Sequence, residues 1–118
     1  MKVTINADTG ANYYYNGSYA SNTGSSLSWT TWSSAGDTFV WFGSQATAAS
    51  TINGFFRIQG CNSSGLKMFD FNATPTAGTA TERWLAGGYW NNTATVSSFK
   101  IESNGSNFDA GTMYVYGA

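Results

Sequence analysis

The side chains able to act as acids or bases in this sequence are six carboxylates, because the chain contains no histidine. They are Asp8, Asp37, Asp70, Glu82, Glu102 and Asp109. Without histidine the chain has no Ser-His-Asp triad and lacks the commonest general base. Two carboxylates alone can hydrolyse a glycosidic bond. However, Asp8, Asp37 and Asp109 lie near glycine in turn sequences, where aspartate usually bonds the local backbone. We therefore expect no enzymatic activity.

The sequence offers no clear ligand set for a metal ion or a cofactor. Residues 8–10 and 107–109 resemble oxygen-ligand loops only loosely, and the EF-hand spacing is absent. Cys61 is the single cysteine, so it forms no intrachain disulfide and has no metal-site spacing around it. No helix follows Gly87-Gly88 to hold a phosphate, and this dipeptide predicts a bulge or a close backbone approach in a strand. We expect no cofactor.

Aromatic side chains have the clearest binding potential in this sequence. The chain holds 8 Phe, 7 Tyr and 5 Trp, and "YYYNGSY" and "GGYWNN" place several of them beside Asn and Gly. Outward rings suit a protein interface, where Tyr and Trp are enriched, or a glycan platform. Successive residues of a strand point to opposite faces, so either Tyr14 or the pair Tyr13 and Tyr15 must face outward or into a partner. For the same reason we expect Trp29 and Trp32 on opposite faces.

A set of aromatic residues forms the candidate surface for a protein interface or a glycan. Its members are Tyr13, Tyr14, Tyr15, Tyr19, Trp32, Tyr89, Trp90, Tyr114 and Tyr116.

The elements that must position these side chains are short strands. No stretch of ten or more residues shows the apolar spacing of a helix, and short aromatic and β-branched runs are bounded by Gly, Asn and Ser clusters instead. The runs predicted as strands are 2–6, 12–20, 27–32, 38–43, 52–60, 66–72, 81–90, 98–103 and 112–117. About nine short strands without helices predict an antiparallel sandwich or barrel, and we expect a jelly-roll-like β-sandwich. The run 38–43 is apolar on both sides and should be a central strand.

The polar loop before the last predicted strand contains two structural residues. Gly111 supplies a positive φ at no steric cost. Phe108 is a lone aromatic residue in polar surroundings, so we expect it to tuck under the loop and plug one end of the sandwich. Replacing Phe108 by serine should then cost a few kcal/mol, as emptying a buried aromatic site does.

Length and charge restrict what this sandwich can do. At 118 residues the chain is expected to be one domain, residues 1–118. Its net charge is −1 with the charged residues scattered singly, which disfavours a nucleic-acid surface and a polybasic membrane contact. We expect neither a transmembrane segment nor a secretory signal. Only 9% of residues are charged, where about a quarter is usual, which predicts either a place in an assembly or unusually hydroxyl-rich exposed faces.

Both ends of the chain carry a resemblance to one family. The closing stretch "VSSFKIESNGSNFDAGTMYVYGA" resembles the end of many tailed-bacteriophage structural proteins, where a strand precedes "GNF.AG" and a last strand ends in "LYG". Residues 106–111 match the first motif, with Ser106 in place of its first glycine. Residues 114–117 match the second, with Val115 at the leucine position. The opening "INADTGANYYY" is similar to the family's "N.DSG.NY", and "AGGYW" followed by "VSSFKI" agrees with the family's spacing.

This resemblance implies a virion structural module without catalytic residues, either a head decoration or part of a tail or fibre. Only Met1 and Lys2 precede Val3, the first inward residue of the first predicted strand, so we expect anchoring through the domain's own faces and loops. That favours a capsid decoration or cement protein on the capsid surface, assembled in the host cytoplasm. The expected partners are the major capsid protein or another virion protein and further copies of the chain, with a trimer as the expected oligomer. The alternative is a tail-associated receptor- or carbohydrate-binding module, and a free-standing hydrolase is disfavoured.

Overall fold

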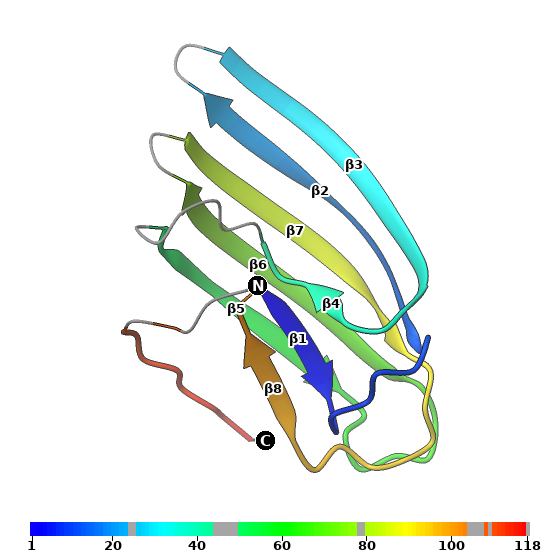
Figure 1. Cartoon of the computed structure of the whole chain (residues 1–118). Coiled ribbons are helices and arrows are strands. Elements are labelled where there is room, and N and C mark those ends of the chain that lie inside the picture. Colours follow the sequence, from blue (N-terminus) through cyan, green and yellow to red (C-terminus); the bar gives the residue numbers. More distant parts are fainter. Residues whose placement is uncertain (24–25, 44–49, 78–79, 104–107, 109, 118) are drawn as a thin grey trace.

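The computed structural model describes residues 1–23, 26–43, 50–77, 80–103, 108 and 110–117. These residues form an all-β structure without helices, in which two antiparallel sheets pack together as a β-sandwich (Figure 1). The strands are β1 (Lys2–Ile5), β2 (Tyr13–Thr23), β3 (Ser26–Asp37), β4 (Val40–Trp41), β5 (Ile52–Gln59), β6 (Lys67–Ala77), β7 (Ala80–Trp90) and β8 (Phe99–Glu102). The prediction of an all-β antiparallel sandwich is confirmed.

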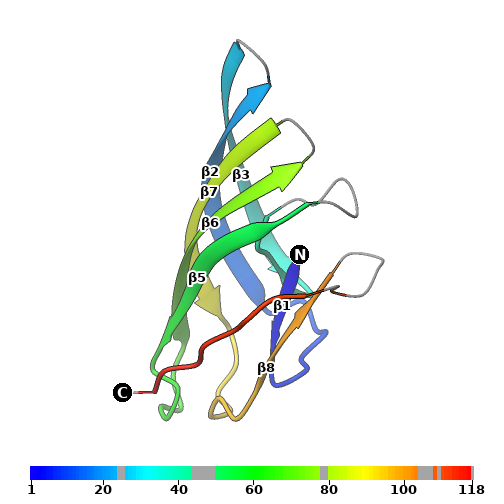
Figure 2. The ribbon, with the colours of Figure 1, turned by 90° about the vertical axis from the view of Figure 1, so that its left-hand side faces the viewer.

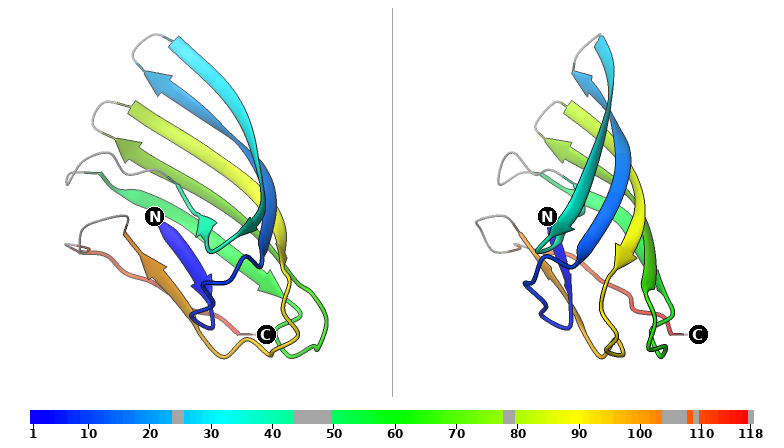
Figure 3. Two further views of the ribbon diagram at one scale, coloured as in Figure 1. Left: turned by 45° about the vertical axis from the view of Figure 1, so that its right-hand side comes forward. Right: turned by 90° about the vertical axis from the view of Figure 1, so that its right-hand side faces the viewer.

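The two sheets differ greatly in size. The larger sheet has the strand order β3-β2-β7-β6-β5, and the smaller has β4-β1-β8. β2, β3, β6 and β7 run for 11 or 12 residues, whereas β1, β4 and β8 have 4, 2 and 4. Because a strand rises about 3.3 Å per residue, the small sheet covers only one end of the large sheet. The β2–β3 and β6–β7 hairpins extend well beyond it (Figures 2 and 3).

The core lies between the sheets at this covered end and is largely aromatic. Strand alternation directs one set of side chains of the large sheet toward the small sheet. The buried core side chains of the two sheets are Tyr13, Tyr15, Phe69, Phe71, Ala73 and Trp90 from the large sheet and Val3, Ile5 and Val40 from the small one. Aromatic rings bury about 150–250 Å² each and so supply the apolar volume that few aliphatic residues provide here.

The run 38–43 is not the central strand that its two-sided apolar pattern predicts. It forms only the two-residue β4, at one edge of the small sheet. Phe42 points into the core, and its ring packs against that of Phe71 with centroids 5.2 Å apart. On the other side, the Lys2 ammonium lies 4.5 Å from the ring centroid of Phe39 and 5.6 Å from that of Trp41. The second apolar side therefore serves a cation–π cluster at an edge and no second layer of core.

The C-terminal part also differs from its prediction. Residues 112–117 are extended, but they pair with no strand that the structure describes. Phe108 is 49% exposed, so the prediction that it plugs the sandwich is wrong. The predicted loss of a few kcal/mol in Phe108→Ser assumed a buried ring and no longer applies. Residues 110–117 run along the open side of the sandwich instead of across its end (Figure 2). Residues 104–107 and 109 lie outside the described residues. Gly111 has a φ of +149°, which favours glycine as predicted.

Candidate binding surfaces

A polar cluster around Asp8 closes the covered end of the sandwich. The Asp8 carboxylate accepts hydrogen bonds from the backbone N of Gly10 (2.8 Å), Nδ2 of Asn12 (2.9 Å) and Nε1 of Trp90 (2.7 Å). Nδ2 of Asn92 donates to it over 3.4 Å. Burial by itself raises the pKa of Asp8, but these donors outweigh it and lower the pKa below its usual value. Such a carboxylate is a structural turn residue, as the sequence predicts, and a poor general base.

The buried partners of this cluster are satisfied as well. The Tyr13 hydroxyl accepts from the backbone N of Ile5 (2.8 Å) and donates to the Asp8 carbonyl oxygen (3.1 Å). Burial raises the pKa of Tyr13 to about 12. Lys67 is fully buried beside Trp90, and its Nζ donates to two backbone carbonyl oxygens at 2.8 and 2.9 Å. The polar groups at the covered end therefore bond one another and belong to the core.

Three candidates for the interface are core residues. Tyr13, Tyr15 and Trp90 are 0, 4 and 0% exposed, so their prediction as binding residues is wrong. The Tyr15 hydroxyl donates to Oδ2 of Asp37 (2.9 Å) and accepts from the backbone N of Trp41 (3.2 Å), and burial raises its pKa. The physical reason is that the small sheet lies over this end of the large sheet and covers their face. Sequence alternation leaves open which of the two faces is covered.

The outer face of the large sheet carries the tyrosines that remain at the surface. Tyr14 on β2 pairs with Tyr89 on β7, and their rings stack with centroids 5.0 Å apart and 6° between the planes. Met68 on β6 is the next residue in this cross-strand row and is 53% exposed. On the same face Phe55 and Trp29 are 56 and 61% exposed. This side of the sheet therefore presents apolar area to solvent at several points.

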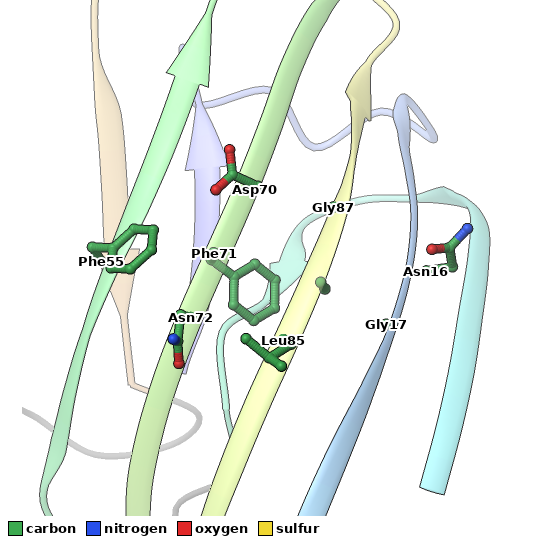
Figure 4. A pocket seen from close by; sticks show the side chains of 9 residues that line it. Asn16, Gly17, Phe55, Asp70, Phe71, Asn72, Leu85 and Gly87 are labelled. Carbon is green, nitrogen blue, oxygen red and sulfur yellow. The ribbon is translucent and has the colours of Figure 1, made fainter.

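A shallow groove crosses the strands of this outer face. Its floor is one cross-strand row with a residue from each strand, in the order Arg57, Asp70, Gly87, Asn16 and Ser33. Gly87 leaves the middle of the row without a side chain. Two adjoining depressions of about 390 and 240 Å³ both include Asn16 and Gly87 in their lining, and Figure 4 shows the larger one.

The groove has polar groups on its floor and mostly apolar groups on its walls. Tyr14 and Tyr89 flank it on one side, and Leu85 and Phe55 flank it on the other with Asn72 between them. At its β5 end, Nε of Arg57 donates to Oδ1 of Asp70 over 2.8 Å. Amide, hydroxyl and carboxylate groups between flat apolar walls are suited to orienting a polar ligand by hydrogen bonds while its apolar faces are covered.

A second aromatic cluster lies on the inner face of the large sheet and consists of Tyr19, Trp32 and Trp84. The rings of Tyr19 and Trp84 stack at 4.8 Å, and Trp32 meets Trp84 edge-on at 4.9 Å. Nε1 of Trp84 donates to Oε2 of Glu82 over 2.7 Å, whereas Nε1 of Trp32 is buried and bonds no atom of the described residues. The structure thus brings together Tyr19 and Trp32, two residues of the predicted candidate surface. Sequence reasoning missed Trp84, although its even step from the inward Trp90 was an available signal.

Two predictions about neighbouring residues are confirmed on these faces. Trp29 lies on the outer face and Trp32 on the inner face, as their odd spacing requires. At Gly88 a Cβ atom would overlap the carbonyl oxygen of Tyr14, so the predicted close backbone approach exists there. At Gly87 the nearest atom to a Cβ would lie at an ordinary 3.5 Å.

The last two candidates for the binding surface, Tyr114 and Tyr116, lie on the C-terminal segment and are 74 and 87% exposed.

Within the described ranges, no three His, Cys, Asp or Glu side chains gather where a metal ion would be held. No helix long and apolar enough to span a bilayer occurs in the part of the chain that the structure describes. In the comparisons with known proteins, no family model, no curated protein and no solved structure matches the chain.

Proposed function

We propose that this chain is a non-enzymatic structural protein of a tailed-bacteriophage virion, a capsid decoration or cement protein that binds neighbouring capsid subunits. The observation that carries the proposal is the apolar surface on the outer face of the large sheet. There Tyr14 and Tyr89 stack, and Trp29, Phe55 and Met68 are each more than half exposed. Aromatic residues and Met are enriched in protein interfaces. The resemblance of both chain ends to phage structural proteins supplies the virion setting.

Docking through this face depends on apolar contact more than on charge. The two charged residues in the groove, Arg57 and Asp70, pair with each other at 64 and 37% side-chain exposure. An exposed pair of this kind contributes little energy and little net charge to a partner. Binding should therefore persist in high salt, which screens charge interactions and leaves apolar burial intact. Many such contacts, repeated over a shell, add up to mechanical reinforcement.

The finer features of the fold belong to this proposal as well. We infer a jelly-roll-like arrangement, which is supported by the nested pairing of β1 with β8 and of β2 with β7. Residues 112–117 would be its ninth strand once they are paired. On the capsid surface the protein would form a closed homo-oligomer, and a trimer suits threefold positions.

Co-sedimentation with emptied phage heads tests the function. Wild-type protein should bind the heads equally well in low and in molar salt. The double variant Tyr14→Ser/Tyr89→Ser removes the stacked pair from the outer face and should lose most of the binding. Leu66→Ser is the control, because it removes an exposed apolar side chain that lies outside the strands of the sheet, in the loop before β6. Release by moderate salt alone, or full binding by the double variant, would overturn the proposal.

The groove favours a second candidate function, a carbohydrate-binding module of a phage tail. Asn16, Asp70 and Ser33 supply hydrogen-bonding groups, and Tyr14 and Tyr89 supply flat rings beside them. Saccharides need both kinds of group, since a sugar ring has hydroxyls at its rim and an apolar face. A glycan array separates the two functions. Binding that disappears in Gly87→Val, which fills the groove, and survives in Ala35→Val, on the same face outside it, would favour the tail module.

A further inference from the structure

The C-terminal segment, defined as residues 110–117, has the side-chain pattern of a strand but pairs with no strand among the residues that the structure describes. Aromatic and aliphatic residues alternate in "TMYVYG", as in a β-strand with two different faces. Met113, Tyr114, Val115 and Tyr116 are 59, 74, 62 and 87% exposed. No backbone hydrogen bond joins the segment to any other residue that the structure describes. Its apolar side chains therefore face solvent, and its backbone is joined to neither of the two described sheets.

One edge of the large sheet, strand β5, could accept a further strand. β5 is the last strand of that sheet, and among the described strands it pairs only with β6. It is 8 residues long and contains neither proline nor lysine, two residues that commonly protect an edge strand, and its one charged residue, Arg57, is paired with Asp70 of β6. Phe56 and Ile58 of β5 are partly buried against the core, and Phe55 is 56% exposed on the outer face. A long apolar edge of this kind is a template for another strand.

The segment of the same molecule does not pair with this edge, although it lies on the same side of the sandwich. In Figures 1 and 2 it starts beyond the end of β8 and runs along the side formed by the edges of β5 and β8. It is already extended there, with Gly111 turning the chain at a φ of +149°. An extended segment close to two open edges, and bonded to neither, is available to a neighbouring molecule.

We propose that residues 112–117 of one copy add as an edge strand to β5 of a second copy. Strand addition lets main-chain hydrogen bonds provide affinity and alternate side chains provide specificity. Met113 and Val115 would lie on the inner face, beside Phe56 and Ile58 at the rim of the core. This pairing satisfies both unpaired backbones and covers the apolar side chains that both now expose.

On the outer face the same pairing is also complementary. Tyr114 and Tyr116 would lie beside Phe55 and Arg57, where ring stacking and a cation–π contact are available. The donated segment and the accepting edge are different surfaces, so each copy gives one strand and receives one. A head-to-tail contact of this type closes into a ring when its rotation allows. The contact specifies how copies associate within the proposed function, and it rests on that function for its biological setting.

Analytical ultracentrifugation of the purified chain tests the contact without any phage component. Wild-type protein should form a closed oligomer, and a chain that ends at Gly111 should be monomeric. Val115→Pro removes one backbone donor from the segment and should strongly weaken association, whereas the matched variant Val115→Thr keeps the donor and a β-branched side chain and should still associate. The segment is exposed, so none of these changes should unfold the sandwich.

Hydrogen exchange supplies the second readout. In the oligomer the amides of 112–117 and those on the free edge of β5 should be protected together, and both should lose protection in Val115→Pro. A monomeric wild type, an oligomer that survives the truncation, or protection of 112–117 in a monomer would each overturn the inference. Head binding is measured separately. Loss of head binding in the outer-face variant, with association intact, supports both proposals, and association without any head binding by wild type refutes the proposed function alone.

Discussion

Two neighbouring cross-strand pairs of the large sheet use the same kinds of residue for opposite purposes. Tyr13 pairs with Trp90 on the inner face, where both are fully buried and their polar atoms are bonded. One residue further on, Tyr14 pairs with Tyr89 on the outer face, where the rings stack but remain partly exposed. The first pair stabilises the sandwich, and the second belongs to the surface through which we propose that the chain binds a partner. Whether an aromatic pair becomes core or stays at the surface depends here on which face the small sheet covers.

The largest expected effect comes from removing the inner pair. Trp90→Ala should lower the free energy of unfolding by about 3–5 kcal/mol, since it empties a buried aromatic site and removes a donor to Asp8. Tyr89→Ala, its outer-face counterpart, should cost about 1 kcal/mol, the value of a ring pair. Urea unfolding of both variants measures the contrast. Similar losses in the two would mean that the outer face is not free in solution.

Asp8 tests how the inner pair is held. Asp8→Ala should lower the free energy of unfolding at neutral pH by about 1–3 kcal/mol, because the buried Nε1 of Trp90 loses its acceptor. The pKa of Asp8 is lowered on folding, so its stabilising effect is complete above the unfolded pKa and disappears as pH falls through the folded one.

Unfolding measured against pH checks this sign. The stability difference between wild type and Asp8→Ala should stay constant from neutral pH to about pH 5 and shrink below about pH 4, where an ordinary aspartate titrates. A difference that grows on acidification would show that the carboxylate is not the favoured form in the folded chain.

The adjacent glycines provide a smaller contrast between the faces. Gly88→Ala should cost about 1–3 kcal/mol, because its Cβ would overlap the carbonyl oxygen of Tyr14 and force β2 to shift. Gly87→Ala should change stability by less than about 0.5 kcal/mol, since its Cβ meets only ordinary contacts. Thermal unfolding gives both values. The reverse order would contradict the placement of the groove floor at Gly87.

The smallest contrast concerns single hydroxyl groups. Tyr13→Phe should cost about 1–2 kcal/mol, because the backbone N–H of Ile5 loses its acceptor, while Tyr14→Phe should be close to neutral. The pKa of Tyr13 is about 12 in the folded chain, so above about pH 10 the unfolded state releases this proton first. Tyr13 should thus contribute a loss of stability between about pH 10 and 12 that Tyr13→Phe lacks. Alkaline denaturation curves that overlay for the two proteins would refute this.

Much of the strand arrangement was accessible from local pattern. The predicted runs 52–60 and 81–90 agree closely with β5 (Ile52–Gln59) and β7 (Ala80–Trp90), because alternation and bounding turn residues are local signals. The prediction of a central strand at 38–43 was wrong, because the second apolar side of this run packs under the side chain of Lys2. The transverse groove was not accessible either, because its floor takes one residue from each of five strands and depends on their register.

The amino-acid sequence by itself determined an all-β, aromatic, charge-poor chain, and the alternation that separates Tyr13 and Tyr15 from Tyr14. Only the tertiary structure decided which of these became core. Local patterns specify two faces for every strand, but burial depends on what packs against each face. The small sheet is too short to cover the whole of the large one. The Tyr19, Trp32 and Trp84 cluster of the large sheet is accordingly only partly buried, with Trp32 and Trp84 packed against the margin of the core.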